Sequence, residues 1–271
     1  MLREMNKNIG FIGAGKMAQA MMEGLVTSNV IAKRNIMASA VSEKTIKQVE
    51  NKYGILTSLN NKEVARFSDI LILAVKPDLH ELVISEIKEE IQKDAIIITI
   101  AAGITLLDIK QWFGYRVKAV RTMPNTPSLV GEGMSALCPN DVLSEVEIRE
   151  VEQLFHCFGQ SERLEEKLMD AIPAISGSSP AYVYMFIEAL ADGGVRQGIP
   201  RDKAYRLAAQ AVLGAAKMVL DTGKHPGELK DNVCTPGGAT IEAVAALEKE
   251  QFRGAILTAM ESCTNKIKNL K

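Results

Sequence analysis

Hydrophobic residues in the first half of the chain gather in short continuous runs, over residues 8–12, 69–75 and 95–101. The last two runs are apolar at successive positions, as expected of parallel strands that are buried on both faces of a sheet. Segments with helical composition follow the three runs, over residues 16–27, 78–92 and 106–113. Because strands that alternate with helices build parallel sheets, this pattern predicts an α/β fold with a doubly wound, mostly parallel sheet.

Weaker signals extend this sheet as far as about residue 164. They predict strands over 35–39, 55–58, 117–122, 134–138 and 161–164, and helices over 43–53 and 144–156. Beyond that point strand signals stop, and turns rich in Gly and Pro separate predicted helices at 180–197, 201–222, 226–233, 239–248 and 251–270. We therefore predict a Rossmann-type dinucleotide-binding domain over 1–164 and an all-helical domain over 165–271.

The helix predicted over 180–197 has unusually few charges for a surface element, Glu188 and Asp192 being its acidic residues. Two interpretations fit a helix of this kind: burial in a subunit interface, or burial in the core of its own domain.

Composition narrows the class of protein. The 32 basic and 33 acidic residues nearly cancel, which gives no indication of a nucleic-acid or membrane partner. The four cysteines are scattered without a C-x-x-C pair, which argues against zinc and against a disulfide framework, and fits a reducing compartment. No signal peptide is evident, and no apolar run approaches the ~18 residues of a membrane span. We expect a cytoplasmic protein that uses no metal.

A glycine-rich turn follows the first predicted strand. Gly13, Gly15 and Ala18 have the spacing G-x-G-x-x-A between strand and helix. In such a turn the first glycine permits the tight bend, the second permits close approach of a pyrophosphate, and the third small residue lets the helix pack against the sheet. The helix N-terminus then offers N–H groups to phosphates. The turn predicts a bound dinucleotide, although glycines of this kind also occur for packing alone.

The end of the second strand indicates the type of dinucleotide. NAD-preferring sites usually place Asp or Glu there to bind the ribose 2′-hydroxyl, and such a carboxylate repels a 2′-phosphate. Here the chain has Ser39 and Ala40, followed by Ser42 and Lys44. Hydroxyls and an ammonium group favour NADPH, with NADH as the alternative. The serines could equally serve as helix caps.

Candidate catalytic side chains in the first half are few. Lys76 follows a central strand, where it is either a cation at the cofactor edge or a side chain that only packs there. His80, His156 and His225 are isolated and lack metal-ligand spacing, which favours structural roles.

Two polar turns in the second half each precede a predicted helix. Residues 176–182 read Ser-Gly-Ser-Ser-Pro-Ala-Tyr, and residues 235–240 read Thr-Pro-Gly-Gly-Ala-Thr. Free N–H groups at such helix starts bind anions, carboxylates included, although either turn alone could be a structural cap. Together with a nicotinamide cofactor, they suggest a small substrate that carries a carboxylate.

An ordered set of motifs resembles the pyrroline-5-carboxylate reductase family across nearly the whole chain. The motifs lie at residues 10–18, 74–77, 101–105, 125–127, 176–182, 191–195, 213–218, 225–227 and 229–240. The resemblance implies NADPH- or NADH-dependent reduction of 1-pyrroline-5-carboxylate to L-proline, the last step of proline biosynthesis. It also implies a helical domain that interlaces with its partner in a homodimer, and dimers in that family often ring into decamers.

The resemblance also implies site residues, position by position. Thr240 would face the ring nitrogen as the catalytic residue, and the carboxylate would be bound by Ser176, Gly177, Ser178, Ser179, Thr235, Gly238 and Ala239. The cofactor would contact Ile12, Gly13, Gly15, Lys16, Met17, Ser39, Asn61, Ala74, Val75, Lys76, Pro77, Ala101, Met123 and Asn125. The family usually has glycine where this chain has Ser179. A serine there is strained if φ is positive and well suited if it caps the helix, which we favour.

The implied reaction is hydride transfer from the nicotinamide C4 to the imine carbon of the ring. No strong acid is present in the predicted pocket, so we expect the imine to arrive protonated, with Thr240 orienting it or relaying a proton through water. A β-hydroxyacid dehydrogenase is an alternative, and it would need a catalytic lysine with a partnering asparagine. Lys217 is followed four residues later by Asp221 instead. A non-catalytic NADPH-binding regulator is the other alternative, and the intact glycine turns argue against it.

Overall fold

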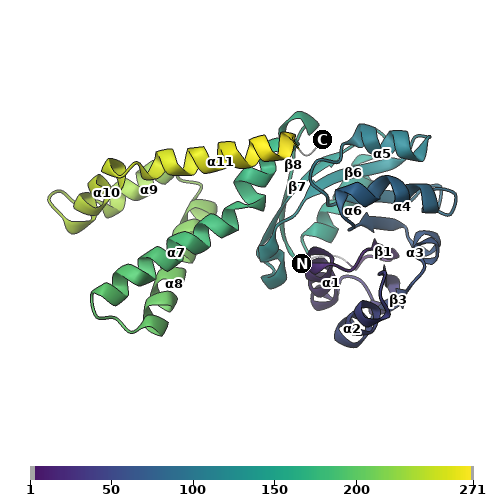
Figure 1. Ribbon diagram of the computed structural model, residues 1–271, viewed down its shortest axis with the longest axis horizontal. Coiled ribbons are helices and arrows are strands. Elements are labelled where there is room, and N and C mark those ends of the chain that lie inside the picture. The colour runs from purple at the N-terminus through teal and green to yellow at the C-terminus, as the bar shows by residue number, and fades with distance from the viewer. Residues whose placement is uncertain (1–3, 270–271) are drawn as a thin grey trace. The chain divides into compact units, whose positions relative to one another are not determined.

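Two compact units make up the protein, for which a computed structural model describes residues 4–269 (Figure 1). The first unit runs as far as Ser178 and also includes the end of the chain from Cys263. The second unit is Ser179–Ser262.

The first unit is built on one sheet of eight strands in the described chain, in the order β3-β2-β1-β4-β5-β6-β7-β8. The strands are β1 (Ile9–Ile12), β2 (Ile36–Ser39), β3 (Leu56–Ser58), β4 (Ile70–Leu73), β5 (Ile96–Thr99), β6 (Lys118–Met123), β7 (Gly133–Pro139) and β8 (Gly159–Arg163). All neighbouring pairs are parallel except β6 and β7. The order reverses between β1 and β4, which confirms the doubly wound prediction and creates a crevice at the carboxyl ends of these strands.

Helices cover both faces of this sheet. Residues of α1 (Lys16–Ser28), α2 (Glu43–Tyr53) and α6 (Glu145–Phe155) share one hydrophobic cluster with strand residues such as Phe11. Residues of α3 (Asn61–Phe67), α4 (His80–Ile87) and α5 (Leu106–Phe113) share the opposite cluster with strand residues such as Leu71. Successive strand side chains point to opposite faces, so the continuous apolar runs supply both clusters.

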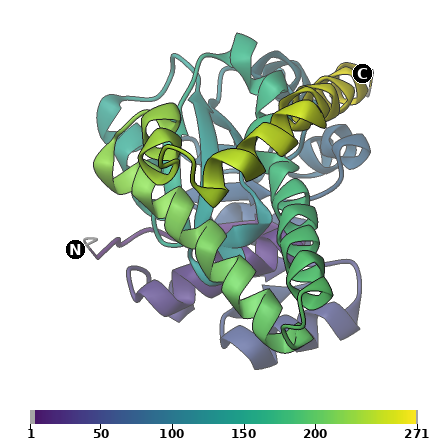
Figure 2. The same ribbon diagram turned by 90° about the vertical axis from the view of Figure 1, so that its left-hand side faces the viewer.

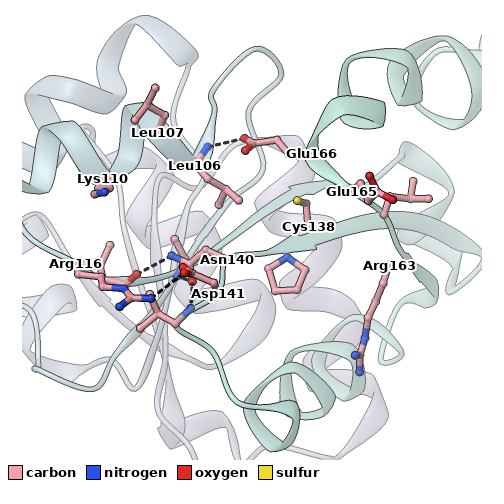
Figure 3. A pocket seen from close by; sticks show the side chains of 15 residues that line it. Leu106, Leu107, Lys110, Arg116, Cys138, Asn140, Asp141, Arg163, Glu165 and Glu166 are labelled. Atoms are coloured by element: carbon pink, nitrogen blue, oxygen red, sulfur yellow. Dashed lines mark hydrogen bonds and ion pairs between the residues drawn. The ribbon is translucent and has the colours of Figure 1, made fainter.

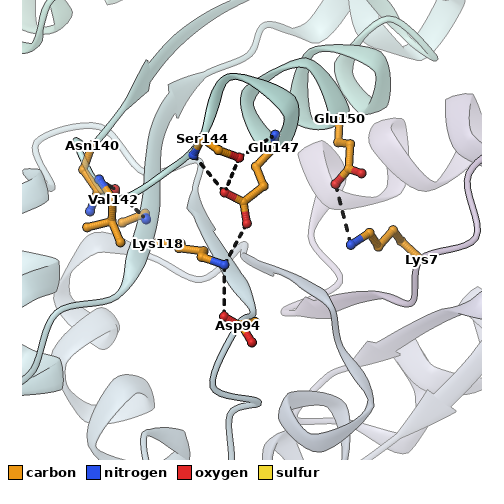
Figure 4. A network of polar contacts seen from close by, with 9 residues as sticks. Lys7, Asp94, Lys118, Asn140, Val142, Ser144, Glu147 and Glu150 are labelled. Atoms are coloured by element: carbon orange, nitrogen blue, oxygen red, sulfur yellow. Dashed lines mark hydrogen bonds and ion pairs between the residues drawn. The ribbon is translucent and has the colours of Figure 1, made fainter.

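Local signals define several helix ends. Thr105 and Asp108 form a reciprocal capping box at α5, and Ser144 and Glu147 do the same at α6. Glu147 also accepts a bond of 2.7 Å from Lys118 (Figure 4). Burial alone would raise the pKa of Glu147, but the bonds from Lys118 and Ser144 lower it to about 2.

Two helix predictions in this unit were incomplete. The helix expected over 78–92 is a 3-10 turn, Pro77–Leu79, followed by α4, which ends at Ile87. Helix α3 was not predicted, because its seven residues are too few to show a clear helical period; the Asn60 side chain caps it by accepting a bond from the Lys62 N–H.

The second unit consists of α7 (Ser179–Arg196), α8 (Arg201–Thr222), α9 (Pro226–Val233), α10 (Ala239–Lys249) and most of α11 (Phe252–Lys268). Helices α7 and α8 lie side by side (Figure 2). These bounds agree with the predicted helices to within one or two residues, except that residue 270, the last of the predicted final helix, lies outside the described residues. In the described chain, no helix is long and apolar enough to cross a membrane.

Few side chains are buried inside this second unit. Its described residues include three buried ones, and all are alanines: Ala191, Ala204 and Ala208. Large apolar side chains of α7 and α8 are exposed instead, including Met185 at 69% and Leu220 at 82%. The low charge of α7 therefore does not reflect a core within its own domain, so that interpretation is wrong.

Candidate functional site

The glycine-rich turn joins β1 to α1 at the crevice. Gly13 has φ of +99°, and a Cβ there would lie 2.6 Å from the carbonyl oxygen of Ala74, so both conformation and space require glycine. Gly15 differs, because a Cβ there would meet no protein atom within 4 Å. Its Cβ position faces open space at the N-terminus of α1, whose first turn has no acidic residue and no side-chain cap. This arrangement suits the close approach of a pyrophosphate.

Ser39, at the end of β2, is buried, and its hydroxyl already has a protein partner. It is 1% exposed, and its hydroxyl donates a 2.7 Å bond to Oδ1 of Asn61. The Asn61 amide in turn donates to Glu86 over 2.9 Å. The structure thus brings two predicted cofactor residues together, with Ser39 orienting Asn61. Sequence reasoning missed the pair because Asn61 begins the unpredicted α3.

The residues after β2 are exposed, and they include Val41, Ser42 and Lys44. Ser42 is the N-cap of α2 and accepts a bond from the Thr45 N–H, so the interpretation of this serine as a helix cap is confirmed. The first turn of α2 also contains Glu43. Lys44, in the same first turn, is an exposed cation.

A buried polar network lies beneath the loops that follow β4 and β5. His80 is fully buried, with Nδ1 3.0 Å from the Lys76 carbonyl oxygen and Nε2 2.9 Å from Oγ1 of Thr99. A carbonyl only accepts, so Nδ1 carries the proton and Nε2 accepts from the Thr99 hydroxyl. Burial lowers the pKa of His80, against smaller opposing effects of the Lys76 carbonyl and Asp78.

This network holds predicted cofactor residues in place through their backbone. The Ala101 N–H donates to Thr99 Oγ1 over 3.3 Å, and the Lys76 carbonyl also accepts from Leu79. Lys76 itself is an exposed residue. A cavity of about 720 Å³ adjoins these loops, lined by Pro77, Gly103 and Trp112 among others.

The segment before α7 is helical rather than the turn we expected. Residues Glu166–Ala171 form a 3-10 helix, and Pro173–Gly177 form a π-helical turn in which the Ser178 N–H donates to the Pro173 carbonyl over 2.7 Å. Ser179 is the first residue of α7 rather than the N-cap ahead of it, so the favoured interpretation of this serine as a helix cap is wrong, and its φ is not positive. Serine is therefore unstrained there. Single-turn π-helices are frequent at functional sites.

The second unit presents its own glycine turn. The Gly238 N–H donates to the Thr235 carbonyl over 3.0 Å, Gly237 has φ of +65°, and Gly238 is the N-cap of α10. The prediction that this turn opens a helix at Ala239 is confirmed. Thr240 follows in the first turn of α10 and is half-buried.

Other candidates have structural partners. Lys217 lies 2.7 Å from Asp221 one turn along α8, so the lysine of the β-hydroxyacid dehydrogenase alternative is paired with a carboxylate. The His225 ring caps α9, and Nε2 of His156 lies 3.1 Å from the Ser161 hydroxyl. Among residues 4–269 no group of three His, Cys, Asp or Glu side chains could hold a metal ion.

A further cavity of about 930 Å³ lies elsewhere, between α5 and the strands β6 to β8 (Figure 3). Arg116 is paired with Asp141 on one side of it, and Glu166 accepts a bond from the Leu106 N–H on another. None of the predicted site residues lines it.

Comparison with known proteins agrees with this geometry. A family model described as NADP oxidoreductase, coenzyme F420-dependent, matches residues 8–103, and one described as pyrroline-5-carboxylate reductase dimerisation matches residues 166–270. Pyrroline-5-carboxylate reductase of Escherichia coli K12 is 45% identical over 266 residues, which cover 98% of this chain and 99% of the relative. The chain belongs to the pyrroline-5-carboxylate reductase family.

Other members of the family are nearly as similar in sequence. The reductase of Arabidopsis thaliana is 41% identical over 97% of this chain and 95% of its own length. The crystal structure of the Plasmodium falciparum reductase with NADP bound superposes with a TM-score of 0.88, at 34% identity and with 98% of each chain covered. These similarities span both units, so the resemblance seen in the motifs extends to the whole fold.

Proposed function

We propose that this protein reduces 1-pyrroline-5-carboxylate to L-proline with NADPH, as the last step of proline biosynthesis. The observation that carries the proposal is that a chain similar over its whole length to such reductases keeps the dinucleotide turn at Gly13 and Gly15, the serine-rich segment at Ser176–Ser179 and the glycine turn that opens α10. A non-catalytic regulator would not need all three.

NADPH would be held by the α1 N-terminus, the loops after β4 and β5, and the residues near Met123. The open space at Gly15 and the absence of a carboxylate at the end of β2 support this cofactor. Lys44 and Ser42 are better placed than the buried Ser39 to meet a 2′-phosphate. When bound, the cofactor supplies the hydride.

The substrate carboxylate would be bound by the turn at Ser176–Ser179 and by the turn at Thr235–Ala239. Thr240 would orient the ring nitrogen or relay a proton to it. Because none of these groups is a strong acid, most of the acceleration would come from holding the reactants in line. We expect Thr240→Ala to lower kcat at least tenfold while leaving NADPH affinity unchanged. Wild-type turnover in this variant would remove Thr240 from the mechanism.

The working form would be a homodimer in the cytoplasm, with the helical domain over 165–271 completed by the same domain of a partner. The exposed apolar side chains of α7 and α8 support this association. Assembly of dimers into a decamer is the further step that the family resemblance suggests.

The proposed activity is tested by following NADPH and NADH oxidation in parallel with 1-pyrroline-5-carboxylate, and by identifying the product. We expect L-proline in equal amount to the oxidised cofactor, and a higher kcat/KM with NADPH. If neither cofactor is consumed, or if hydroxyacids are oxidised instead, the proposal fails.

A further inference from the structure

Three side chains from one face of β6 and the loop after it hold the segment that precedes α7. Arg121 is 4% exposed and lies 2.5 Å from Asp170 and 3.7 Å from Glu166. Met123, two residues on, packs close to Gly177: a Cβ added to Gly177 would lie 3.1 Å from the Cε of Met123. Asn125, two residues further, binds Ser176.

The Asn125 side chain is 8% exposed and bonded at both ends. Its Nδ2 donates to the Ser176 carbonyl over 2.9 Å, and its Oδ1 accepts from the Met134 N–H over 2.9 Å. An amide has two N–H groups and one oxygen, so these two bonds fix the orientation of the group. The side chain therefore ties the start of β7 to the π-helical turn.

The sequence explains why Ser176 needs this partner. In a regular helix the Ser176 carbonyl would accept a bond from the N–H four residues later, and that residue is Pro180, which has none. A carbonyl left without a donor costs free energy if it is removed from water. Asn125 supplies the missing donor from a different part of the chain.

We propose that Asn125 is a positioning residue, which holds the turn at Ser176–Ser178 open for the substrate carboxylate instead of binding the cofactor. The inference rests on the proposed function, because it assigns a role within that carboxylate site. Without the bond from Asn125, the Ser176 carbonyl would have to move to reach another donor. The Ser176 and Ser178 hydroxyls would move with the backbone of the turn. The loss falls on substrate binding, since the glycine turn and the loops after β4 and β5 are untouched.

The chain offers a matched control at the other end of the same strand pair. Asn140 donates to the Val117 carbonyl over 2.8 Å, and its Oδ1 accepts from the N–H groups of Ala119 and Val142, each over 3.3 Å, so it also ties backbone to backbone. Figure 4 shows Asn140 beside Val142. Asn125→Asp keeps the acceptor for Met134 and removes only the donor to Ser176. Asn125→Ala removes both bonds, and Asn140→Ala removes the three bonds of the control side chain.

We expect both Asn125 variants to raise the KM for 1-pyrroline-5-carboxylate about tenfold or more, with the Kd for NADPH within about twofold of wild type. Asn140→Ala should change neither value. NADPH titration by fluorescence also verifies that each variant is folded. A rise in the Kd for NADPH with an unchanged KM would show that Asn125 binds the cofactor, and unchanged values of both would also overturn the proposal.

A double-mutant cycle with Pro180→Ala tests the mechanism of the effect. Alanine restores an N–H at position 180, so Asn125→Ala should raise KM less in this background than in wild type. Equal effects in the two backgrounds would contradict the role of the Ser176 carbonyl. If wild-type protein itself fails to reduce 1-pyrroline-5-carboxylate, the proposed function fails, which is a different result from any of these.

Discussion

The two units differ in how they bury apolar side chains. The first packs aromatic and aliphatic residues such as Tyr53, Phe113 and Phe155 to 2% exposure or less, on both faces of its sheet. The second buries three alanines in its described part and leaves Tyr184, Met185 and other large side chains exposed. Helical units of this size are stabilised mainly by packing of their apolar faces, which here has to come from outside the unit.

This difference in burial determines which unit can be stable without a partner. A unit with its own core can hold a cofactor site in place without help. A unit whose apolar face is unpartnered depends on association, and its stability then depends on protein concentration. In a family whose helical domain is described as a dimerisation domain, a second copy of this chain is the natural partner.

The largest effect should follow from placing a charge on the apolar face of the second unit. Met185→Lys would bury an ammonium group in the proposed dimer interface, so we expect monomers in sedimentation velocity and a loss of reductase activity of about 100-fold or more. Leu82→Lys is the matched control, because Leu82 is 68% exposed on α4 of the first unit. A Met185→Lys monomer with wild-type activity would refute the dependence on a partner, and a dimer with wild-type activity would place the interface away from Met185.

Truncation in the core of the first unit should have the next largest effect. Phe155 is fully buried and its ring centroid is 5.2 Å from that of Phe158, so Phe155→Ala should lower the free energy of unfolding by about 3–5 kcal/mol. Leu59→Ala, at a side chain that is 55% exposed, should change it by less than about 0.5 kcal/mol. Urea denaturation measures both, and similar values for the two would contradict the assigned core.

A smaller effect is expected at the end of β2. Lys44→Gln removes the exposed cation, so it should raise the KM for NADPH about fivefold to tenfold with little change for NADH. Lys47→Gln, one turn later in α2, serves as the control because Lys47 is paired with Glu43. Equal changes for both cofactors would place the 2′-phosphate elsewhere.

The smallest effect is a dependence of stability on pH. Burial lowers the pKa of His80 in the folded protein, while in the unfolded chain it has its ordinary value near 6.5. The unfolded state therefore binds more protons, so stability should fall as pH is lowered from about 6.5 towards the folded-state pKa. His80→Gln should remove that part of the dependence, measured as urea midpoints between about pH 5 and 7.5. An unaltered profile would show that His80 does not contribute.

Local signals made most of the fold predictable. The apolar runs gave the central strands, and the spacing at Gly13, Gly15 and Ala18 located the switch point of the sheet, because these features depend on neighbours in the chain. Non-local contacts were not predictable. No sequence pattern links Ser39 with Asn61, or His80 with Thr99, since each pair meets only after strands from distant segments align. The π-helical turn was taken for a loop because its stabilising partner, Asn125, lies 51 residues earlier.

Fluorescence titration of NADPH into the Met185→Lys protein tests the division between the two units most directly. The variant should bind NADPH with a Kd within about threefold of wild type, although it no longer forms L-proline, because the first unit holds the cofactor site on its own core. A Kd for NADPH that rises as steeply as the activity falls would show that cofactor binding, too, requires the partner.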